Sequence, residues 1–539
     1  MNDASLALKD VSYVLPNGRM LFSGLTEHFG IGTAGLVGRN GVGKTLLARI
    51  LAGQIQPTSG HSLRSGTVHY LAQQVTFPPD ATVADLTGLR HLLDALERIE
   101  SGSTAASDFD ALDEHWDIRQ RLHHALEESD LGHLDSRSLI SRLSGGQCMR
   151  LALIGSQLSG ADYLILDEPS NHLDRDNRRH LIEQLRRWPK GLMVISHDRQ
   201  LLNAMDHILE LSPRGLTRYG GNYDFYAQSK AQERSRAQQL LDQRKHQRQQ
   251  ARRNMQQQHE RQQRKLASGQ RDAKTANQAR ILLDGQKNRS EATAGSLSRT
   301  QNARREQLDE AVKKAAGQVD NEDRISLHSL PVTAPVRRRV VHLDDVVLPY
   351  LTEPTSRISM TLSGRQRIGV LGPNGCGKST LLRMLAGRIA PLAGQCQLPS
   401  THAFLDQRFD NMNPHESVLE QLRANNQQAA RSDLCMRLAH LGLDAARINL
   451  PFCRLSGGEQ LKAALACVLY AEPPPPLLLL DEPDNHLDLP SVQALEHMLS
   501  GYQGLMMVVS HDDRFLNQLD LTDHLLATEQ GWCLRPLSH

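Results

Sequence analysis

Two short stretches of the chain have residue types and spacing that can hold a polyphosphate. Residues 38–45 and 372–379 both follow the pattern G-x-x-x-x-G-K-[ST], in which backbone N–H groups cradle phosphate oxygens. The lysine of each loop is expected to bind the β- and γ-phosphates of a nucleotide, and the hydroxyl that follows it is expected to ligate Mg²⁺. The predicted nucleotide-binding residues of the two loops are Gly38, Asn40, Gly41, Gly43, Lys44 and Thr45, and Gly372, Asn374, Gly375, Gly377, Lys378 and Ser379.

A pair of acidic residues ends an apolar run in each half of the chain. The first acid of each pair, Asp167 or Asp481, suits a contact with Mg²⁺. The second acid, Glu168 or Glu482, is placed to act as the general base that activates an attacking water. A lone D-E-P sequence after a strand is commonly just an exposed loop. Its recurrence at matched positions behind two phosphate loops favours the catalytic interpretation.

A serine and two glycines open a predicted helix in each half. Such a turn makes an anion site from backbone N–H groups and the helix dipole. We expect the helices themselves to run from Met149 and Leu461 onward. The residues of these two turns are Ser144, Gly145 and Gly146, and Ser456, Gly457 and Gly458.

These landmarks recur in the same order at nearly constant offsets. The offset is 334 residues for Lys44 and Lys378 and for Gln73 and Gln407, and 312 residues for the two serine turns. The first copy therefore has 22 extra residues, which we place in the polar stretch 97–117. Apolar strands are expected at Ala34–Val37, Tyr163–Leu166, Leu192–Ile195, Arg367–Leu371, Leu477–Leu480 and Leu505–Val509, with helices at Thr45–Ala52 and Ser379–Ala386.

Continuous apolar strands that alternate with helices indicate a buried, largely parallel sheet in each copy. The predicted fold is therefore α/β, with cassettes over residues 1–226 and 337–539 joined by a mainly α-helical linker over residues 227–336.

Charge is distributed unevenly along the 539 residues. The whole chain has a formal net charge of +2, but residues 228–316 contain 21 Lys or Arg and 9 Asp or Glu, which gives a local net charge of +12. Such a basic block predicts a polyanionic partner. The seven cysteines are scattered, the N-terminal residues lack the features of a signal peptide, and no apolar run approaches the ~20 residues that span a bilayer. We therefore expect a cytoplasmic protein without a membrane segment.

The linker has the composition of long helices with solvated faces. Residues 227–349 contain no aromatic side chain, and proline is absent until Pro331. A break between two antiparallel helices is expected at Ser268–Gly269, or alternatively near Gly285 or Gly295. The same composition is also compatible with a disordered linker.

Taken together, these motifs resemble those of the ABC ATPase superfamily. Three features resemble its ABC-F branch: two cassettes in one chain without membrane helices, the string D-E-P-x-N-H-L-D in both halves, and the sequence over 219–226 that precedes the basic linker. The resemblance implies that His197 and His511 are switch histidines that contact the γ-phosphate and that Gln73 and Gln407 sense Mg²⁺ and the attacking water.

The resemblance also implies how the cassettes cooperate. Each serine turn would be a signature motif that closes over the nucleotide held by the opposite cassette, so that Lys44 pairs with Ser456 and Lys378 with Ser144. Pairing of this kind within one chain is compatible with a monomer. The expected cofactors are ATP and Mg²⁺.

Members of the ABC-F branch associate with ribosomes, so rRNA and the P-site tRNA are the expected partners of segment 228–316. Dense Arg and Lys without aromatics suits phosphate contacts rather than base stacking. A translation factor that relieves stalling and an antibiotic-resistance protein both fit this resemblance. The ATPase subunit of a transporter is a further alternative that the basic linker disfavours.

The sequence departs from the family pattern at three pairs of positions. The usual threonine of D-E-P-T is replaced in both halves, the fifth signature residue differs between the halves, and only the first half offers an aromatic residue for stacking on adenine. The pairs are Ser170 and Asp484, Gln147 and Glu459, and Tyr13 and Leu348. These departures keep the catalytic residues in place and leave open whether the two ATP sites are equally active.

Overall fold

The computed structural model describes residues 5–72, 78, 80–113, 115–171, 173–275, 302–317, 339–406, 409, 411–485 and 487–537. The chain divides into two compact units, each described here by itself. The first unit comprises Met1–Phe225 with Asp323–His539, and the second comprises Tyr226–Glu322. The domain boundaries expected at 226/227 and 336/337 remain predictions.

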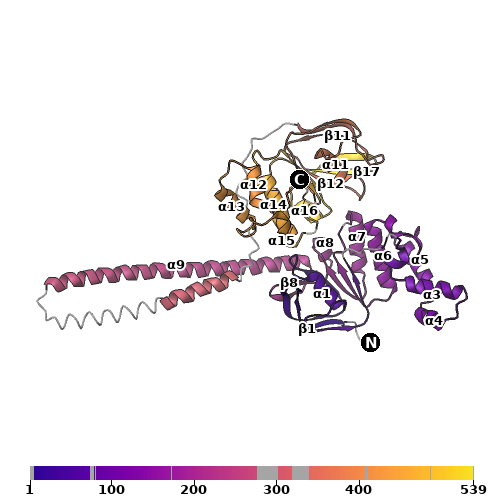
Figure 1. Ribbon diagram of the computed structural model, residues 1–539, viewed down its shortest axis with the longest axis horizontal. Coiled ribbons are helices and arrows are strands. Elements are labelled where there is room, and N and C mark those ends of the chain that lie inside the picture. The colour runs from indigo at the N-terminus through magenta and orange to yellow at the C-terminus, as the bar shows by residue number, and fades with distance from the viewer. Residues whose placement is uncertain are drawn as a thin grey trace. The chain divides into compact units, whose positions relative to one another are not determined.

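Each cassette is built on a six-stranded sheet (Figure 1). Four neighbouring pairs of strands in each sheet are parallel, and the last strand pairs antiparallel at one edge. In spatial order, the first sheet contains β5 (Val68–Leu71), β6 (Tyr163–Asp167), β7 (Gly191–Ile195), β3 (Thr33–Val37), β8 (His207–Ser212) and β9 (Gly215–Tyr219). The second contains β14 (Ala403–Leu405), β15 (Leu477–Asp481), β16 (Leu505–Val509), β12 (Arg367–Leu371), β17 (Asp523–Thr528) and β18 (Gly531–Pro536).

The predicted α/β fold with parallel central strands is confirmed. Every residue of β6, β7, β15 and β16 is buried, which explains why these strands are almost uniformly apolar in the sequence. Because parallel strands point the same way, their carboxyl ends meet at one edge of the sheet. The phosphate loops follow β3 and β12 at this edge, and the acidic pairs lie at the ends of β6 and β15.

A three-stranded antiparallel sheet completes the core of each cassette. In cassette 1, buried Leu8 of the antiparallel sheet, Leu36 of β3 and Ile50 of helix α1 (Lys44–Leu51) belong to one apolar cluster. In spatial order, the sheets are β2 (Met20–Phe29), β1 (Ser5–Val14) and β4 (Ser59–Ser65), and β11 (Arg357–Ser363), β10 (Arg339–Val347) and β13 (Ala393–Gln397).

Helices pack on both central sheets. Cassette 1 contains α1 (Lys44–Leu51), α2 (Val83–Leu86), α3 (Arg90–Glu100), α4 (Ala106–Leu112), α5 (Ile118–Glu128), α6 (Gly145–Leu158), α7 (Arg175–Arg186) and α8 (Arg199–Leu202). Cassette 2 contains α11 (Lys378–Leu385), α12 (Val418–Asn425), α13 (Arg431–His440), α14 (Gly457–Leu469), α15 (Leu489–Ser500) and α16 (Asp513–Asn517). The stretch 97–117, where the extra residues of the first copy were expected, contains the end of α3 and all of α4.

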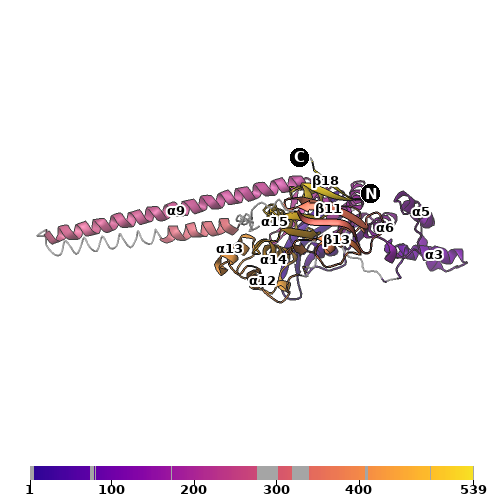
Figure 2. The same cartoon turned by 90° about the horizontal axis from the view of Figure 1, so that it is seen from above.

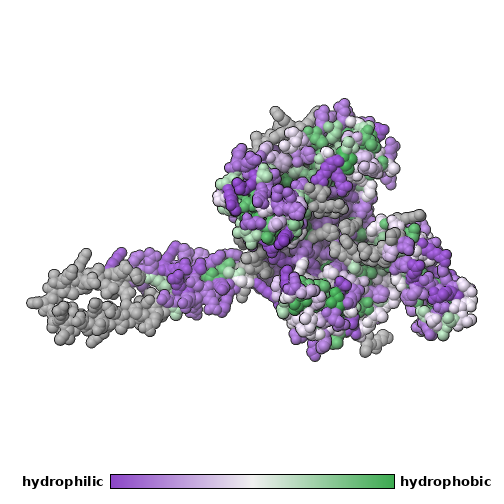
Figure 3. All heavy atoms as spheres, in the orientation of Figure 1, coloured by the Kyte–Doolittle hydropathy of each residue, from purple (hydrophilic) through white to green (hydrophobic). Residues whose placement is uncertain are grey.

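The described residues of the second unit form two helices. Helix α9 (Tyr223–Thr275) has 53 residues, and a second helix covers residues 302–317 (Figure 2). At 1.5 Å per residue, α9 is about 80 Å long. The helices pack through Leu241 and Val312, and Asp309 lies 3.5 Å from Arg248 and 3.7 Å from Arg252. Hydrophilic residues dominate the visible face of the described part of α9 (Figure 3).

The described part of the linker is therefore helical, as predicted, but one proposed break in it is wrong. Helix α9 continues through Ser268–Gly269 to Thr275. A single exposed glycine costs a helix only about 1 kcal/mol relative to alanine, which a long helix tolerates. The alternative breaks, near Gly285 and Gly295, lie outside the described residues. None of the helices in the described part of the chain has the length and apolar composition needed to cross a membrane.

Candidate active site

The first phosphate loop connects β3 to α1 through backbone that only glycine adopts easily. Gly43 has a φ of 104°, in the left-handed region that disfavours side chains. A Cβ atom on Gly38 would lie 2.4 Å from the carbonyl oxygen of Leu211, so no side chain fits there. The Lys44 ammonium folds back and donates to the carbonyl of Gly38 at 2.8 Å. The loop is thus a pre-formed cradle with a cation at its centre.

The second loop repeats this arrangement. Gly377 has a φ of 99°, and Lys378 donates to the carbonyls of Gly372 at 2.8 Å and Pro373 at 2.9 Å. Burial lowers the pKa of both lysines, while nearby carboxylates such as Glu168 and Glu482 act in the opposite direction. A bound polyphosphate would supply the negative charge that a buried ammonium needs.

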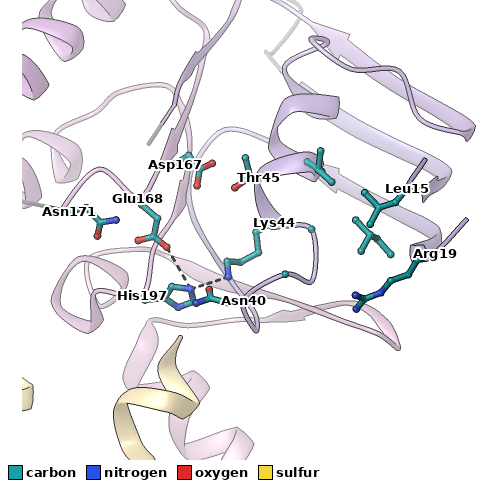
Figure 4. Close-up of a pocket in the computed structure, with 13 residues that line it drawn as sticks. Leu15, Arg19, Asn40, Lys44, Thr45, Asp167, Glu168, Asn171 and His197 are labelled. Atoms are coloured by element: carbon teal, nitrogen blue, oxygen red, sulfur yellow. Dashed lines mark hydrogen bonds and ion pairs between the residues drawn. The ribbon is translucent and has the colours of Figure 1, made fainter. Parts of the chain in front are cut away.

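A hydroxyl and a carboxylate lie side by side in each cassette. The Thr45 side chain lies beside Asp167 and acts to lower the pKa of that carboxyl (Figure 4), and the Ser379 hydroxyl donates to Oδ1 of Asp481 at 2.9 Å. Both pairs offer hard oxygen ligands, which are the ligands that Mg²⁺ prefers. Burial raises the pKa of both aspartates, an effect that a bound cation would reverse. These residues therefore fit Mg²⁺, which would neutralise phosphate charge when bound.

The two glutamates share an uncommon backbone conformation. Glu168 and Glu482 both have a φ of 50°, in the left-handed region. The Glu168 N–H donates to the Ile195 carbonyl at 2.8 Å, and the Glu482 N–H donates to the Val509 carbonyl at 2.9 Å. Such a conformation costs on the order of 1–3 kcal/mol and persists only where its surroundings enforce it. Both cassettes thus aim a carboxylate from the end of a buried strand toward the neighbouring histidine loop.

Each glutamate faces the histidine that follows the adjacent strand. Nε2 of the histidine lies 3.6 Å from Oε1 of the glutamate in both cassettes. In the first cassette, Nε2 of His197 also lies 3.0 Å from the Lys44 ammonium (Figure 4). Because an ammonium can only donate, Nε2 must accept this bond while Lys44 is charged. Burial, followed by Lys44, lowers the pKa of His197 to about 3, so the imidazole is neutral at neutral pH.

The histidine of the second cassette has different partners. Burial, followed by Lys378 and Arg178, lowers the pKa of His511 to about 4. Its Nε2 is buried and has no hydrogen-bond partner in the described part of the chain. Both histidines are therefore neutral, but among the described residues only His197 contacts the lysine of its own phosphate loop, at 3.0 Å. The two sites are chemically alike without being identical.

Cavities open beside both phosphate loops. The first has a volume of about 490 Å³, within the range of small-molecule sites, and the second about 240 Å³. The first is lined by Leu15, Arg19, Leu21, Asn40, Gly41, Gly43, Lys44, Thr45, Leu46, Asp167, Glu168, Asn171 and His197. The second is lined by Asp174, Arg175, Asp176, Arg179, Leu371, Gly372, Pro373, Ser510, His511, Asp513, Leu526 and Ala527.

An aspartate of each cassette reaches the phosphate loop of the other. Oδ2 of Asp488 accepts a hydrogen bond from the Asn40 N–H at 3.0 Å, and Oδ2 of Asp174 accepts one from the Asn374 N–H at 3.3 Å. Both aspartates also cap the helix that follows them, α15 or α7. Neither aspartate was predicted from the sequence as a site residue. Their place at the end of the twinned D-E-P-x-N-H-L-D string was the available signal.

The signature serines are N-caps. The Ser144 hydroxyl accepts from the Gln147 N–H at 3.3 Å, and both serines form capping boxes with the residue three positions on. Because of these caps the helices begin at Gly145 and Gly457, so the predicted starts at Met149 and Leu461 are four residues late. The fifth signature residue, Gln147 or Glu459, supplies the reciprocal bond in each case.

The signature residues do not line either of the two cavities beside the phosphate loops. Across the described residues, neither cavity is lined by any of Ser144, Gly145, Gly146, Ser456, Gly457 and Gly458. Their expected pairing with the opposite nucleotide remains a prediction. Gln73 and Gln407 lie outside the described residues.

The two residues considered for adenine packing lie in different surroundings, and the expected stacking on Tyr13 remains a prediction. Leu348 is fully buried in the core of cassette 2, so it cannot face a ligand, whereas Tyr350 is 89% exposed. In cassette 1 the ring of Tyr13 packs near that of Phe22, and Arg19 lines the cavity. The sequence repeat relates Tyr13 to Leu348 near the ends of β1 and β10. It does not show which side chains near those strand ends are buried and which are exposed.

Comparison with known proteins agrees with this geometry. The profile of the ABC transporter family matches residues 32–171 and 355–485, which include both phosphate loops and both acidic pairs. The chain belongs to the ABC family. Relatives include the tylosin resistance ATP-binding protein TlrC of Streptomyces fradiae, which is 34% identical over 89% of this chain and 90% of that protein. The ribosome protection protein VmlR of Bacillus subtilis is 28% identical over 90% of this chain and 80% of its own length.

Within the family, this is a twin-cassette protein of the ABC-F type. A relative named ABC transporter F family member 5, from Arabidopsis thaliana, is 28% identical over 98% of the chain and 73% of its own length. Archaeal ribosome recycling factor aABCE1 has a fold similar to that of this chain. Its crystal structure was determined in a complex with archaeal ribosomal stalk protein aP1. The TM-score is 0.56 at 18% identity, over 98% of this chain and 90% of that one.

Proposed function

We propose that this chain is an ATP-hydrolysing ABC-F protein that acts on the ribosome in the cytoplasm through segment 228–316. The observation that carries the proposal is a basic helical pair between two ATP-binding cassettes. Segment 228–316 has a net charge of +12 and no aromatic residue. Lys245, Arg252 and Arg253 of α9 are exposed. Such a surface suits an RNA backbone, whose phosphates attract Lys and Arg without requiring base stacking.

ATP hydrolysis follows from residues that converge at the end of each central sheet. Glu168 and Glu482 are the proposed general bases, and His197 and His511 are the neutral histidines that would contact the γ-phosphate. The 3.6 Å separation of each glutamate from its histidine supports this pairing of roles. ATP with Mg²⁺ would occupy the phosphate loops, and Gln73 and Gln407 would complete the sites.

We also propose that the sites are composite. The contacts of Asp488 with Asn40 and of Asp174 with Asn374 already link each phosphate loop to the other cassette. Closure would add the signature turn at Ser456 to the first site and the turn at Ser144 to the second. The output would be a cycle of cassette closing and opening that moves the helical pair on the ribosome, with rRNA and P-site tRNA as its contacts. Pairing within the chain makes a monomer sufficient.

Antibiotic resistance by ribosome protection is a second candidate function. It is favoured by the match to a tylosin resistance protein over 90% of that protein's length, and by the match to a ribosome protection protein. Growth in the presence of tylosin, with and without expression of the chain, tests this candidate. Unchanged inhibition by tylosin would favour a general role in translation.

The main experiment is sucrose-gradient sedimentation of lysate with ATP, comparing the chain with its Glu168→Gln/Glu482→Gln variant. The variant should accumulate in ribosomal fractions, because it would bind ATP without hydrolysing it. Absence of both proteins from these fractions would refute ribosome action. Recovery in the membrane fraction after a high-salt wash would instead favour the ATPase subunit of a transporter.

A further inference from the structure

The interface between the two cassettes contains a charge difference that breaks the internal repeat. At the 314-residue offset, Ser170 of cassette 1 corresponds to Asp484 of cassette 2, and Arg178 corresponds to Val492. Cassette 2 therefore has an acid where cassette 1 has a hydroxyl, and cassette 1 has a base where cassette 2 has an apolar side chain. All four residues line the same cavity of about 40 Å³. The added acid and the added base thus face one enclosed space.

Arg178 is bound on one side to its own cassette. The residue is 7% exposed, and its Nε lies 3.2 Å from Oδ2 of Asp198. Asp198 follows His197 directly and caps α8 through Oδ1, which accepts from the Gln200 N–H at 2.9 Å. The guanidinium is therefore tied to the loop that presents the histidine of the first ATP site.

The acids on the other side belong to the histidine loop of the second ATP site. Oδ2 of Asp484 accepts from the Ser510 hydroxyl at 2.8 Å, and the Ser510 oxygen accepts from the Asp512 N–H at 3.0 Å. These bonds bracket His511. Oδ1 of Asp484 is buried and has no hydrogen-bond partner within the described residues. Both Asp484 and Asp512 line the cavity that Arg178 lines.

Arg178 therefore shares this buried space with three aspartates, Asp198, Asp484 and Asp512, and with Glu168 of the first acidic pair. Burial and the neighbouring Asp512 raise the pKa of Asp484 to about 7, and Ser510 and Arg178 act in the opposite direction. Burial and the neighbouring Asp198 likewise raise the pKa of Asp512, which Arg178 again opposes. Like charges repel strongly in a low-dielectric interior. The Arg178 guanidinium therefore stabilises the contact between the loop that carries Asp198 and the loop that carries Asp512.

We propose that Arg178 is a positioning residue for the second ATP site, because its guanidinium neutralises Asp198 of its own cassette together with Asp484 and Asp512 of the other. It thereby holds the Ser510–Asp512 loop, and with it His511, against cassette 1. Arg178 touches no reacting atom and acts through the loop. The inference rests on the proposed function, since it requires that His511 take part in ATP hydrolysis.

A set of substitutions separates this role from a general packing role. Arg178→Val leaves Asp198, Asp484 and Asp512 without its guanidinium, whereas Asp484→Ser removes the added acid. The double variant R178V/D484S recreates the uncharged pair that Ser170 and Val492 already form in the same cavity. Arg186→Val changes an exposed arginine of the same helix, α7, and serves as the matched control.

The readouts are kcat and KM of ATP hydrolysis by the full chain, and nucleotide trapping resolved at the Lys378 site. We expect R178V to lower kcat by about tenfold or more, with KM changed by less than about threefold, because the loop and not the phosphate cradle is disturbed. Trapping at the Lys378 site should fall in parallel. D484S and the Arg186 control should stay within about threefold of the wild-type kcat, and R178V/D484S should lie between R178V and wild type, because Asp198 and Asp512 still lack the cation.

Partial recovery of kcat in the double variant is the decisive outcome, since losses from packing alone would add rather than cancel. A double variant as slow as R178V, or an R178V variant as fast as wild type, would overturn the inference. Where R178V does not accumulate as folded protein, the double variant still decides, because a folded but inactive R178V/D484S contradicts the proposal. A wild-type chain without ATPase activity would instead refute the proposed function itself.

Discussion

The aspartate that ends the N-H-L-D string of cassette 2 makes two bonds that substitution can separate. Oδ1 of Asp488 accepts from the Ser491 N–H at 3.1 Å and so caps α15, while Oδ2 accepts from the Asn40 N–H of the first phosphate loop at 3.0 Å. Asp488→Ala removes both bonds. Asp488→Ser keeps a good N-cap but its shorter side chain gives up the bond to cassette 1.

The expected losses can be worked from these contacts. Removing an N-cap costs about 1 kcal/mol, and a hydrogen bond to a charged group is worth about 1.5–3 kcal/mol. We therefore expect Asp488→Ser to lower the free energy of unfolding by about 1.5–3 kcal/mol and Asp488→Ala to lower it by about 1 kcal/mol more. Gln493→Ser, at an exposed position of α15, is the matched control and should stay within about 0.5 kcal/mol of the parent.

Urea unfolding followed by tryptophan fluorescence measures these differences in cassette 2. The chain has three tryptophans, and Trp532, whose indole N–H donates to the Thr355 carbonyl at 2.8 Å, is the one in cassette 2. Replacing Trp116 and Trp188 by Phe in the parent and in every variant makes Trp532 the sole reporter. An Asp488→Ser variant as stable as the parent would show that the bond to Asn40 contributes nothing in solution. Equal losses for Ser and Ala would show that the cap contributes nothing.

The general bases, the first signature turn and one core glycine can each be tested by substitution. Glu168→Gln with Glu482→Gln should retain ATP binding and lower the steady-state ATPase rate by about 10²-fold or more, and a wild-type rate would contradict the general-base role. Ser144→Arg should reduce nucleotide trapping at the second ATP site roughly tenfold, whereas a loss confined to the first site would exclude the expected cross-pairing. Gly155→Ala should lower the urea stability of cassette 1 by about 1–3 kcal/mol, since its Cβ would lie 2.2 Å from the Thr87 carbonyl oxygen; unchanged unfolding would reject that packing.

Elements fixed by local pattern could be predicted closely from the sequence. The strands expected at Arg367–Leu371 and Leu505–Val509 are β12 and β16 residue for residue, and the helices after the phosphate loops are displaced by one residue. Where a uniformly apolar run is bounded by glycine, proline or charged residues, the sequence closely limits where the strand or helix begins and ends. Start positions set by side-chain caps were predicted less well, as the helices that begin at Gly145 and Gly457 show.

Features that depend on tertiary structure could not be read from the chain. The left-handed conformation of Glu168 is enforced by the neighbouring strand, and the bond of Asp488 to Asn40 joins residues 448 positions apart. The burial of Leu348 and the exposure of Tyr350 likewise depend on where the antiparallel sheet ends. Helix α9 continues through Ser268–Gly269, because the cooperativity of a long helix outweighs the tendency of these two residues to end it.

The basic helical pair is proposed to carry the protein to the ribosome. The salt dependence of ribosome binding tests this proposal most directly. Five cations of α9 have no acidic partner among the residues that the structure describes, so their replacement by Gln should leave both helices intact: Arg244, Lys245, Arg253, Arg261 and Arg264. Replacing the four arginines by Lys keeps the charge and provides the matched control. Arg248 and Arg252 are left unchanged because they pair with Asp309.

The measurement is co-sedimentation with purified ribosomes at several salt concentrations, in the Glu168→Gln/Glu482→Gln background with ATP. Each phosphate contact contributes roughly 0.7–0.9 to the slope of log K against log salt. The glutamine variant should therefore bind more weakly, with a slope smaller by up to about 4, while the lysine control should keep the parental slope. Equal binding and an unchanged slope for the glutamine variant would contradict the claim and leave the helical pair as a spacer between two ATP-binding cassettes.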